Sequence, residues 1–261
     1  MPGFESFTIG VVLWITAVLV LAGFVHGALG LGFPIVATPL IAMVSDIRSA
    51  VILVLLPCLA TVVASIVKGG PLREVLLEFW AMPIYAFCGA LLGTRLFIAY
   101  PQVPFSLLLA AVILVYLNLD RLGGTDWPWI RNRRRLCGAL FGFLGGVSEG
   151  TANIAAPPLV VYYLGIGIGP ATLVQALNLC FLTGKTTQFA TLTLSGGVSA
   201  TQWLITLPLA LFAVGAVLAG VHVRNRIDAA TYRSWLKRAL FVIALILLAQ
   251  YAYAALTPPQ E

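Results

Sequence analysis

Long apolar segments with few charges dominate this chain. Most of them approach the roughly 20 residues that a helix needs to cross a bilayer. None shows the two-residue alternation of a membrane β-strand, so the pattern predicts an all-α polytopic membrane protein. We expect apolar segments at 8–28, 33–45, 49–67, 78–99, 104–119, 136–148, 152–165, 170–193, 200–221 and 236–255.

Two glycine- and proline-rich stretches interrupt these segments. The first runs from His26 to Pro39 and the second from Gly145 to Pro158. Glycine lacks a Cβ atom and proline lacks an N–H, so neither stretch is expected to continue a helix. Placing Pro39 on Pro158 aligns the two breaks at a separation of 119 residues. Interrupted apolar segments at corresponding positions of two halves indicate a transporter binding site.

The composition and the distribution of charged residues agree with a membrane protein. Hydrophobic residues make up 61% of the 261 residues and charged residues only 9%, which excludes a single soluble core. The net charge of +6 arises from basic residues that border apolar spans, so it indicates membrane orientation and not nucleic-acid binding. The start of the chain has no basic region before its first apolar run, and we expect no cleaved signal.

Twelve of the fifteen Lys and Arg residues lie in three loops. If these loops are cytoplasmic, an even number of spans separates them, and each broken segment must be a helical hairpin, either re-entrant or fully spanning. Both termini are then extracytoplasmic, and the two repeats have inverted topology, each with one hairpin and three transmembrane helices. We expect a first repeat at 1–120, a basic cytoplasmic linker at 121–135 and a second repeat at 136–261.

The sequence contains few other residues or motifs that indicate a metal site, a disulfide or a bound cofactor. The four cysteines lie singly in apolar segments and are interpreted as small hydrophobic residues rather than metal ligands or disulfides: Cys58, Cys88, Cys137 and Cys180. No nucleotide-binding motif is present, so we expect secondary transport without a cofactor.

Several motifs resemble the sulfite exporter TauE/SafE family over nearly the whole chain. They are HGALGLGFPIVATPLIA, its degenerate copy FLGGVSEGTANIAAPPLVVYYLG, and PIYAFCGALLGTRL. The family's glycine run is only partly matched, by Gly30 to Pro34 in the first copy. The resemblance implies an inner-membrane transporter, an exporter of small sulfur-containing anions such as sulfite, sulfonates or sulfoacetate.

Ionisable residues inside spans are costly and therefore indicate function. Glu149 is expected at the unwound tip of the second hairpin, beside the positive end of a half-helix that begins near Thr151 or Ala152. Lys185 either binds the anion or pairs with Glu149. Gln175 and Asn178 share its helix face. The predicted substrate-binding residues are His26, Gly30, Gly32, Ser148, Glu149, Gly150, Thr151, Asn153, Gln175, Asn178 and Lys185.

Glu149 and His26 are the candidate proton-coupling residues, with protons as the coupling ion. Alternatives are an anion channel, a partner-dependent membrane subunit and, less favoured, an intramembrane hydrolase. The last follows from Gly146 to Gly150, which fit G-x-S-x-G with Ser148 as nucleophile and His26 as base. The substrate, the direction of transport and the oligomeric state are left open by these patterns.

Overall fold

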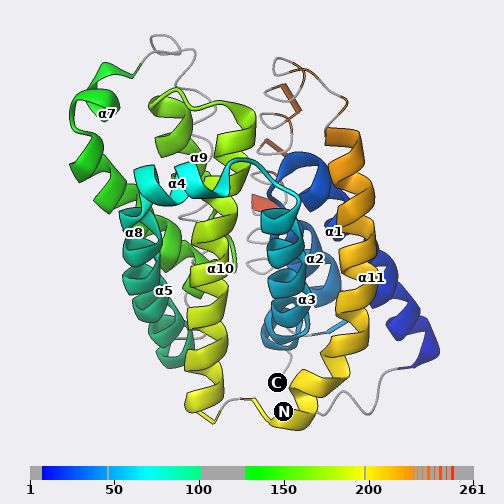
Figure 1. Cartoon of the computed structure of the whole chain (residues 1–261). Helices are drawn as coiled ribbons and strands as arrows, with labels where there is room; N and C mark the ends of the chain where they lie inside the picture. Colours follow the sequence, from blue (N-terminus) through cyan, green and yellow to red (C-terminus); the bar gives the residue numbers. More distant parts are fainter. Residues whose placement is uncertain are drawn as a thin grey trace.

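The computed structural model describes residues 8–45, 47–100, 127–196 and 198–224, with scattered residues between 226 and 249 (Figure 1). Every regular element in that part is an α-helix. Of the predicted spans, 104–119 and most of 236–255 lie outside the described residues. The helices of the first half are α1 Ile9–Leu29, α2 Phe33–Ala42, α3 Ile47–Val67, α4 Leu72–Phe79 and α5 Ala81–Ala99. Those of the second half are α7 Pro128–Asn132, α8 Arg134–Ala152, α9 Ala156–Gly165, α10 Pro170–Leu194 and α11 Ala200–Arg224.

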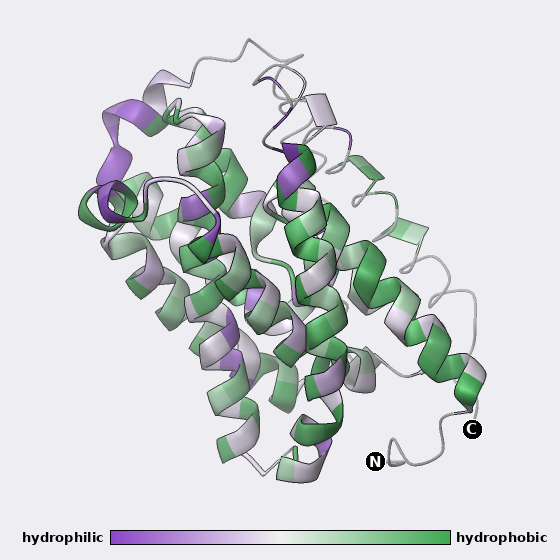
Figure 2. Ribbon diagram, turned by 45° about the vertical axis from the view of Figure 1, so that its right-hand side comes forward, coloured by the Kyte–Doolittle hydropathy of each residue, from purple (hydrophilic) through white to green (hydrophobic). Residues whose placement is uncertain are grey.

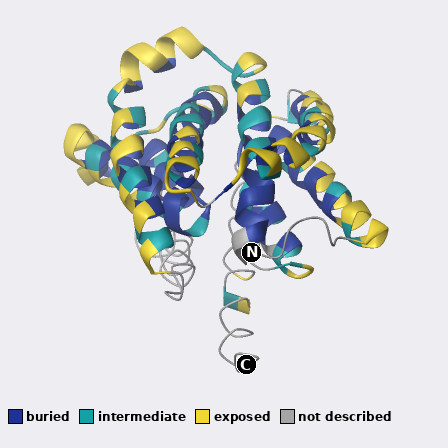
Figure 3. Cartoon of the chain, turned by 90° about the horizontal axis from the view of Figure 1, so that it is seen from below, coloured by how far each residue is buried: buried dark blue, intermediate teal, exposed yellow. Residues whose placement is uncertain are grey.

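Among the described residues, four helices are long and apolar enough to cross a membrane. These are α1, α3 from Ser49, α5 and α11. Their outer faces carry exposed apolar side chains, such as Leu211 on α11 at 77% exposure. Leu77, on the short neighbouring helix α4, is 70% exposed. Buried residues gather in the interior in Figure 3. Apolar side chains on the outside and close packing within are what a lipid environment requires.

Both broken segments form hairpins, as the charge pattern predicted. The Trp14 Nε1–H donates to the Leu40 carbonyl over 3.0 Å, so α2 runs back along α1. In the second half the Tyr162 hydroxyl donates to the Arg134 carbonyl over 3.3 Å, so α9 returns along α8. The returning helices have ten residues each, about 15 Å, which is half of a hydrocarbon core. Each hairpin therefore combines a long helix with a half-length one.

The turns are shorter than the sequence predicted. Helix α1 continues through Gly27 and ends at Gly30, whose φ is 73°, and Gly32 follows with a φ of 107°. Helix α8 continues through Gly150 and ends at Asn153, with a φ of 62°. Such left-handed backbone suits glycine and asparagine. The expectation that the chain unwinds from His26 or from Gly145 is wrong, because glycine inside a helix also permits close helix packing.

The two halves correspond element by element. Gly30 matches Asn153, and the first residues of α2 and α9 match as well, each pair 123 residues apart. The alignment on Pro39 and Pro158 is thus wrong by four residues, about one helical turn. The equivalent helices α3 and α10 run antiparallel. The Gln175 Nε2 at the start of α10 donates to the Ile66 carbonyl at the end of α3, over 3.3 Å.

At the opposite end of this helix pair, Ile52 and Leu192 share one apolar cluster. Since equivalent helices have opposite directions, the repeats have inverted topology. Each repeat also packs against the other through glycine. A Cβ atom on Gly27 of α1 would collide with the Val217 carbonyl of α11, and one on Gly146 of α8 with the Ala86 carbonyl of α5. The long arm of each hairpin thus lies against the last described long helix of the other half.

Basic segments gather at one end of the molecule. Helices α4 and α7 and the final turn of α11 lie at the top of Figure 1, where Figure 2 shows the most hydrophilic ribbon, whereas α1 begins at the opposite end. Arg134, the first residue of α8, binds α4 at this end, because its Nη2 lies 2.5 Å from the Glu78 carboxylate and its guanidinium lies over the Phe79 ring. This segregation is the arrangement expected of a cytoplasmic face.

Candidate functional site

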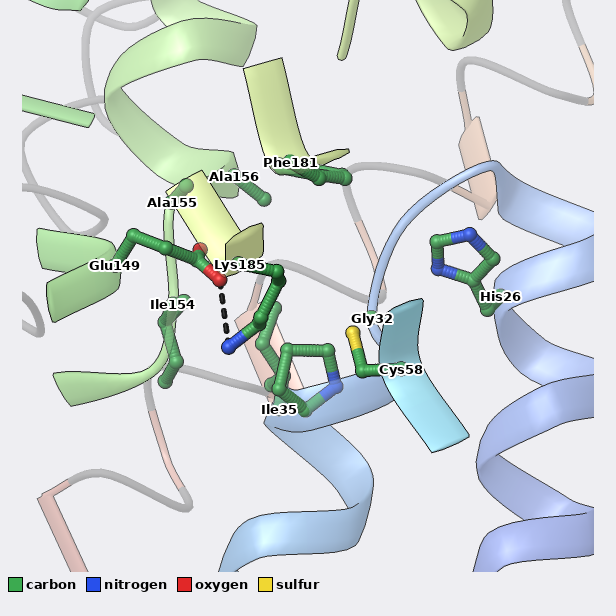
Figure 4. Close-up of a pocket in the computed structure, with 11 residues that line it drawn as sticks. His26, Gly32, Ile35, Cys58, Glu149, Ile154, Ala155, Ala156, Phe181 and Lys185 are labelled. Atoms are coloured by element: carbon green, nitrogen blue, oxygen red, sulfur yellow. Dashed lines mark ion pairs between the residues drawn. The ribbon is translucent and has the colours of Figure 1, made fainter. Parts of the chain in front are cut away.

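The tips of the two hairpins face each other across a small cavity (Figure 4). Gly32 and the first turn of α2 contribute one wall, and Ala155 with the first residue of α9 contributes the facing wall. Both half-length helices therefore direct their N-termini at the same space. Each such terminus carries a partial positive charge. The residues that line the cavity are His26, Gly32, Pro34, Ile35, Cys58, Glu149, Ile154, Ala155, Ala156, Phe181 and Lys185.

A buried ion pair occupies one side of the cavity. The Lys185 Nζ lies 2.6 Å from the Glu149 Oε1, and both side chains are almost completely buried. Two unpaired charges at this depth would be strongly unfavourable, so each residue makes the other tolerable. The pair is formally neutral. Of the two roles that the sequence left open for Lys185, the structure shows the ion pair with Glu149. The pair also joins α10 to the second hairpin.

Two amide side chains hold the lysine in place. Lys185 Nζ also donates to the Asn153 Oδ1 at the second tip and, over 3.2 Å, to the Gln188 Oε1 one helical turn further along α10. The Asn153 Nδ2 donates to the Thr38 hydroxyl over 2.9 Å, so this tip is bonded to α2 of the first hairpin. The Gln188 Nε2 donates to the Glu149 carbonyl over 3.4 Å. The ammonium position is therefore set by both hairpins and α10 together.

The first tip is bonded to α10 through Asn178. Its Nδ2 donates to the carbonyl of Gly30 over 3.3 Å, and its Oδ1 lies 3.1 Å from the His26 Nε2. His26 is buried in the last turn of α1. The seven-residue spacing between Asn178 and Lys185 places one polar group of α10 at each tip. Helix α10 is thus the element that contacts both halves of the cavity.

Seven of the eleven predicted residues are not part of the cavity lining. Gly30, Asn153 and Asn178 form the bonds between the hairpin tips and α10, and the other four lie elsewhere. The Thr151 hydroxyl donates to the Val147 carbonyl within α8, and Gly150 packs against α5. Ser148 is half-buried in the same helix, and Gln175 is bonded to α3 at the far end of α10. The predicted place of Glu149 at the positive end of a half-helix is wrong. Glu149 lies in the last turn of α8, and the positive end belongs to α9, which begins at Ala156.

The structure also adds residues that the sequence did not single out. Cys58 of α3 and Phe181 of α10 line the cavity, and Thr38 binds the second tip. Cys58 and Phe181 lie within ordinary apolar runs, so no local signal marks them. Gln188 is different, because it continues the polar face of α10 at three residues from Lys185. That spacing was a usable signal.

The comparisons with known proteins decide the family. The sulfite exporter TauE/SafE family model matches residues 15–251. The chain belongs to this family. No curated protein and no solved structure matches it. As a TauE/SafE member with several spanning helices, it is a multi-pass membrane protein of a transporter family.

The structure does not provide the geometry that the hydrolase alternative requires. The segment Gly146 to Gly150 lies inside helix α8, whereas the nucleophile motif needs a sharp strand-to-helix turn. His26 lines the cavity and Ser148 is not among the lining residues. A transporter family is also a poor context for this chemistry.

Proposed function

We propose that this TauE/SafE protein is a secondary transporter that exports small sulfur-containing anions such as sulfite, sulfonates or sulfoacetate. Transport would proceed by alternating access around the cavity between the hairpin tips. One observation carries the proposal: two half-helix N-termini and the buried ammonium of Lys185 face the same cavity. A compact oxyanion suits this set, because dipoles and a cation act on it from three elements.

The ion pair gives the cavity a defined charge. With Lys185 and Glu149 both ionised, the pair has no net charge, so an added anion would leave one uncompensated negative charge in a buried site. A co-bound proton removes this imbalance. We therefore propose protons as the coupling ion, with Glu149 and His26 as the two groups at the cavity that can accept one.

The inverted repeat provides the elements that would move during transport. Each hairpin tip is bonded to α10, through Asn178 at one tip and Lys185 at the other. In alternating access, one set of contacts would loosen while the other holds, opening the cavity to one side at a time. Breaking a few hydrogen bonds of about 1 kcal/mol each is within reach of substrate binding.

The test is flux in proteoliposomes that contain the purified protein. We expect saturable counterflow of radiolabelled sulfite, competed by small sulfonates and abolished by Lys185→Met. The matched control is Lys68→Met, because Lys68 is exposed and lies away from the cavity. Counterflow separates a carrier from a channel, which would give ohmic currents instead. Absence of sulfur-anion flux and binding in the folded wild-type protein would overturn the proposal.

A further inference from the structure

The environment of His26 holds its ring in one orientation. The imidazole lies 6.5 Å from the Phe33 ring, edge to face, and 6.5 Å from the Phe181 ring. It is 1% exposed. Its Nε2 is 3.1 Å from the Asn178 Oδ1. Aromatic rings on two sides and a hydrogen bond on a third leave the ring little freedom to rotate.

Asn178 determines which ring nitrogen carries hydrogen. The Asn178 Nδ2 faces two main-chain carbonyls, those of Val174 at 2.8 Å and Gly30 at 3.3 Å. Carbonyls only accept, so the amide nitrogen must point to them and the amide oxygen must point to His26. The oxygen accepts, and the His26 Nε2 therefore donates. In the neutral imidazole, this places the lone pair on Nδ1.

The second ring nitrogen of His26, Nδ1, is available to bind a proton. The Nδ1 of His26 is buried and has no hydrogen-bond partner among the described residues. Figure 4 shows one nitrogen of the ring turned towards the side on which Gly32, Cys58 and Lys185 lie. A buried polar atom without a partner costs about 1–3 kcal/mol, which indicates a role beyond packing. When neutral, Nδ1 presents a lone pair that repels an anion, and when protonated it presents an N–H donor.

We propose that His26 binds the proton that accompanies the anion, so that the anion and an Nδ1–H on His26 occupy the cavity together. This rests on the proposed function. The Lys185–Glu149 pair is neutral, and one proton on His26 supplies the single positive charge that a monoanion needs. Glu149 is the weaker acceptor for this proton, because its carboxylate is already bonded to Lys185.

Several charged or titratable groups surround the ring. Across the cavity lie Glu149 of α8, Lys185 of α10 and the thiol of Cys58 on α3. From α11, Arg224 adds a repulsive positive charge. Helix α2 contributes no titratable residue. Both cations oppose a proton on His26 in the empty site, and an anion bound in the cavity offsets this repulsion, so anion and proton should bind cooperatively.

The experiment measures methanesulfonate binding by calorimetry, since this anion keeps one charge throughout the range in which histidine titrates. For wild type we expect the affinity to fall up to about tenfold per pH unit between about pH 6 and 8, with uptake of one proton per anion. His26→Gln keeps a donor for Asn178 but accepts no proton. It should bind with an affinity that is independent of pH and without proton uptake. His222→Gln, at the exposed end of α11, is the matched control and should behave as wild type.

The outcomes separate the two proposals. Anion binding without pH dependence in wild type, or pH dependence that persists in His26→Gln, would overturn the role of His26 while leaving transport intact. Failure of the wild-type protein to bind any sulfur anion at any pH would instead overturn the proposed function. If His26→Gln does not fold, nitrogen NMR of the ¹⁵N-histidine-labelled His222→Gln protein, in which His26 is the one remaining histidine, decides the matter. An imidazole that becomes protonated when methanesulfonate binds supports His26, and one that stays neutral overturns its role.

Discussion

His26 and Glu149 occupy equivalent positions in the two inverted repeats. Each lies four residues before the left-handed residue that ends its helix, and each main-chain carbonyl accepts the N–H of that residue. One is a histidine bonded to Asn178 and the other a carboxylate paired with Lys185. The same backbone position thus presents an imidazole at one tip and a carboxylate at the other. The asymmetry of the site comes from side chains, on a frame that is nearly symmetric.

The effects of substituting Lys185 and Glu149 on the free energy of unfolding should depend strongly on each other. Lys185→Met leaves Glu149 buried without its cation, and we expect the free energy of unfolding in detergent to fall by about 3–5 kcal/mol. The double variant Lys185→Met/Glu149→Met should regain most of that loss and still fail to bind anions. A double variant as unstable as the single one would show that packing, not charge pairing, sets the cost.

Asn153 has two roles that substitution can separate. Asn153→Gly keeps the left-handed backbone but removes the bond to Lys185, so we expect anion affinity to fall about tenfold with little loss of stability. Asn153→Ala should lose the same affinity and an additional ~1–2 kcal/mol of stability, because alanine resists a positive φ. Thermal unfolding and calorimetric titration measure the two effects. Equal stability of the two variants would contradict the backbone part of this prediction.

Close helix packing predicts a sharp contrast within α11. A Cβ atom on Gly220 would collide with the Phe24 carbonyl of α1, whereas one on Gly215 would meet nothing within 4 Å. We expect Gly220→Ala to cost about 1–3 kcal/mol through displacement of the helices. Gly215→Ala, the matched control, should be neutral or stabilising by up to about 1 kcal/mol. Unfolding in detergent compares them directly, and tolerance of both would argue against the observed pairing of α1 with α11.

Cys58 offers a direct probe of access. It lines the cavity, whereas Cys180 is buried elsewhere against the Tyr163 hydroxyl. In a variant that keeps only Cys58, a small methanethiosulfonate reagent should react slowly, and saturating sulfite or methanesulfonate should slow it at least about tenfold. The variant that keeps only Cys180 should remain unlabelled throughout. Labelling of Cys58 that the anions do not affect would place their binding outside this cavity.

Membrane orientation follows from the basic end of the molecule. We expect the connection after α10 to be extracytoplasmic and the α7 end to be cytoplasmic. In a cysteine-free background, Ser195→Cys should react with a membrane-impermeant reagent in intact cells. Arg133→Cys should react only after the membrane is opened. The reverse pattern would invert the predicted orientation, including that of both termini.

The amino-acid sequence by itself predicted the membrane class, the two hairpins and the inverted repeat, and it gave pairing with Glu149 as one of two roles for Lys185. These depend on local properties: apolar length, glycine and proline at the turns, basic loops, and the high cost of a buried charge. Helical spacing also placed Asn178 and Lys185 on one face of α10, where the structure confirms them.

Only the tertiary structure decided the register of the repeats and the membership of the cavity. Glycines such as Gly146 were expected to interrupt a helix, yet they remain helical, because a helix from the other repeat packs closely against them. Contacts between distant segments place Cys58 and Phe181 at the cavity and Gln175 away from it. The hydrogen on His26 Nε2 likewise follows from an amide that two carbonyls orient. Long-range packing sets these features, and no local pattern of residues encodes them.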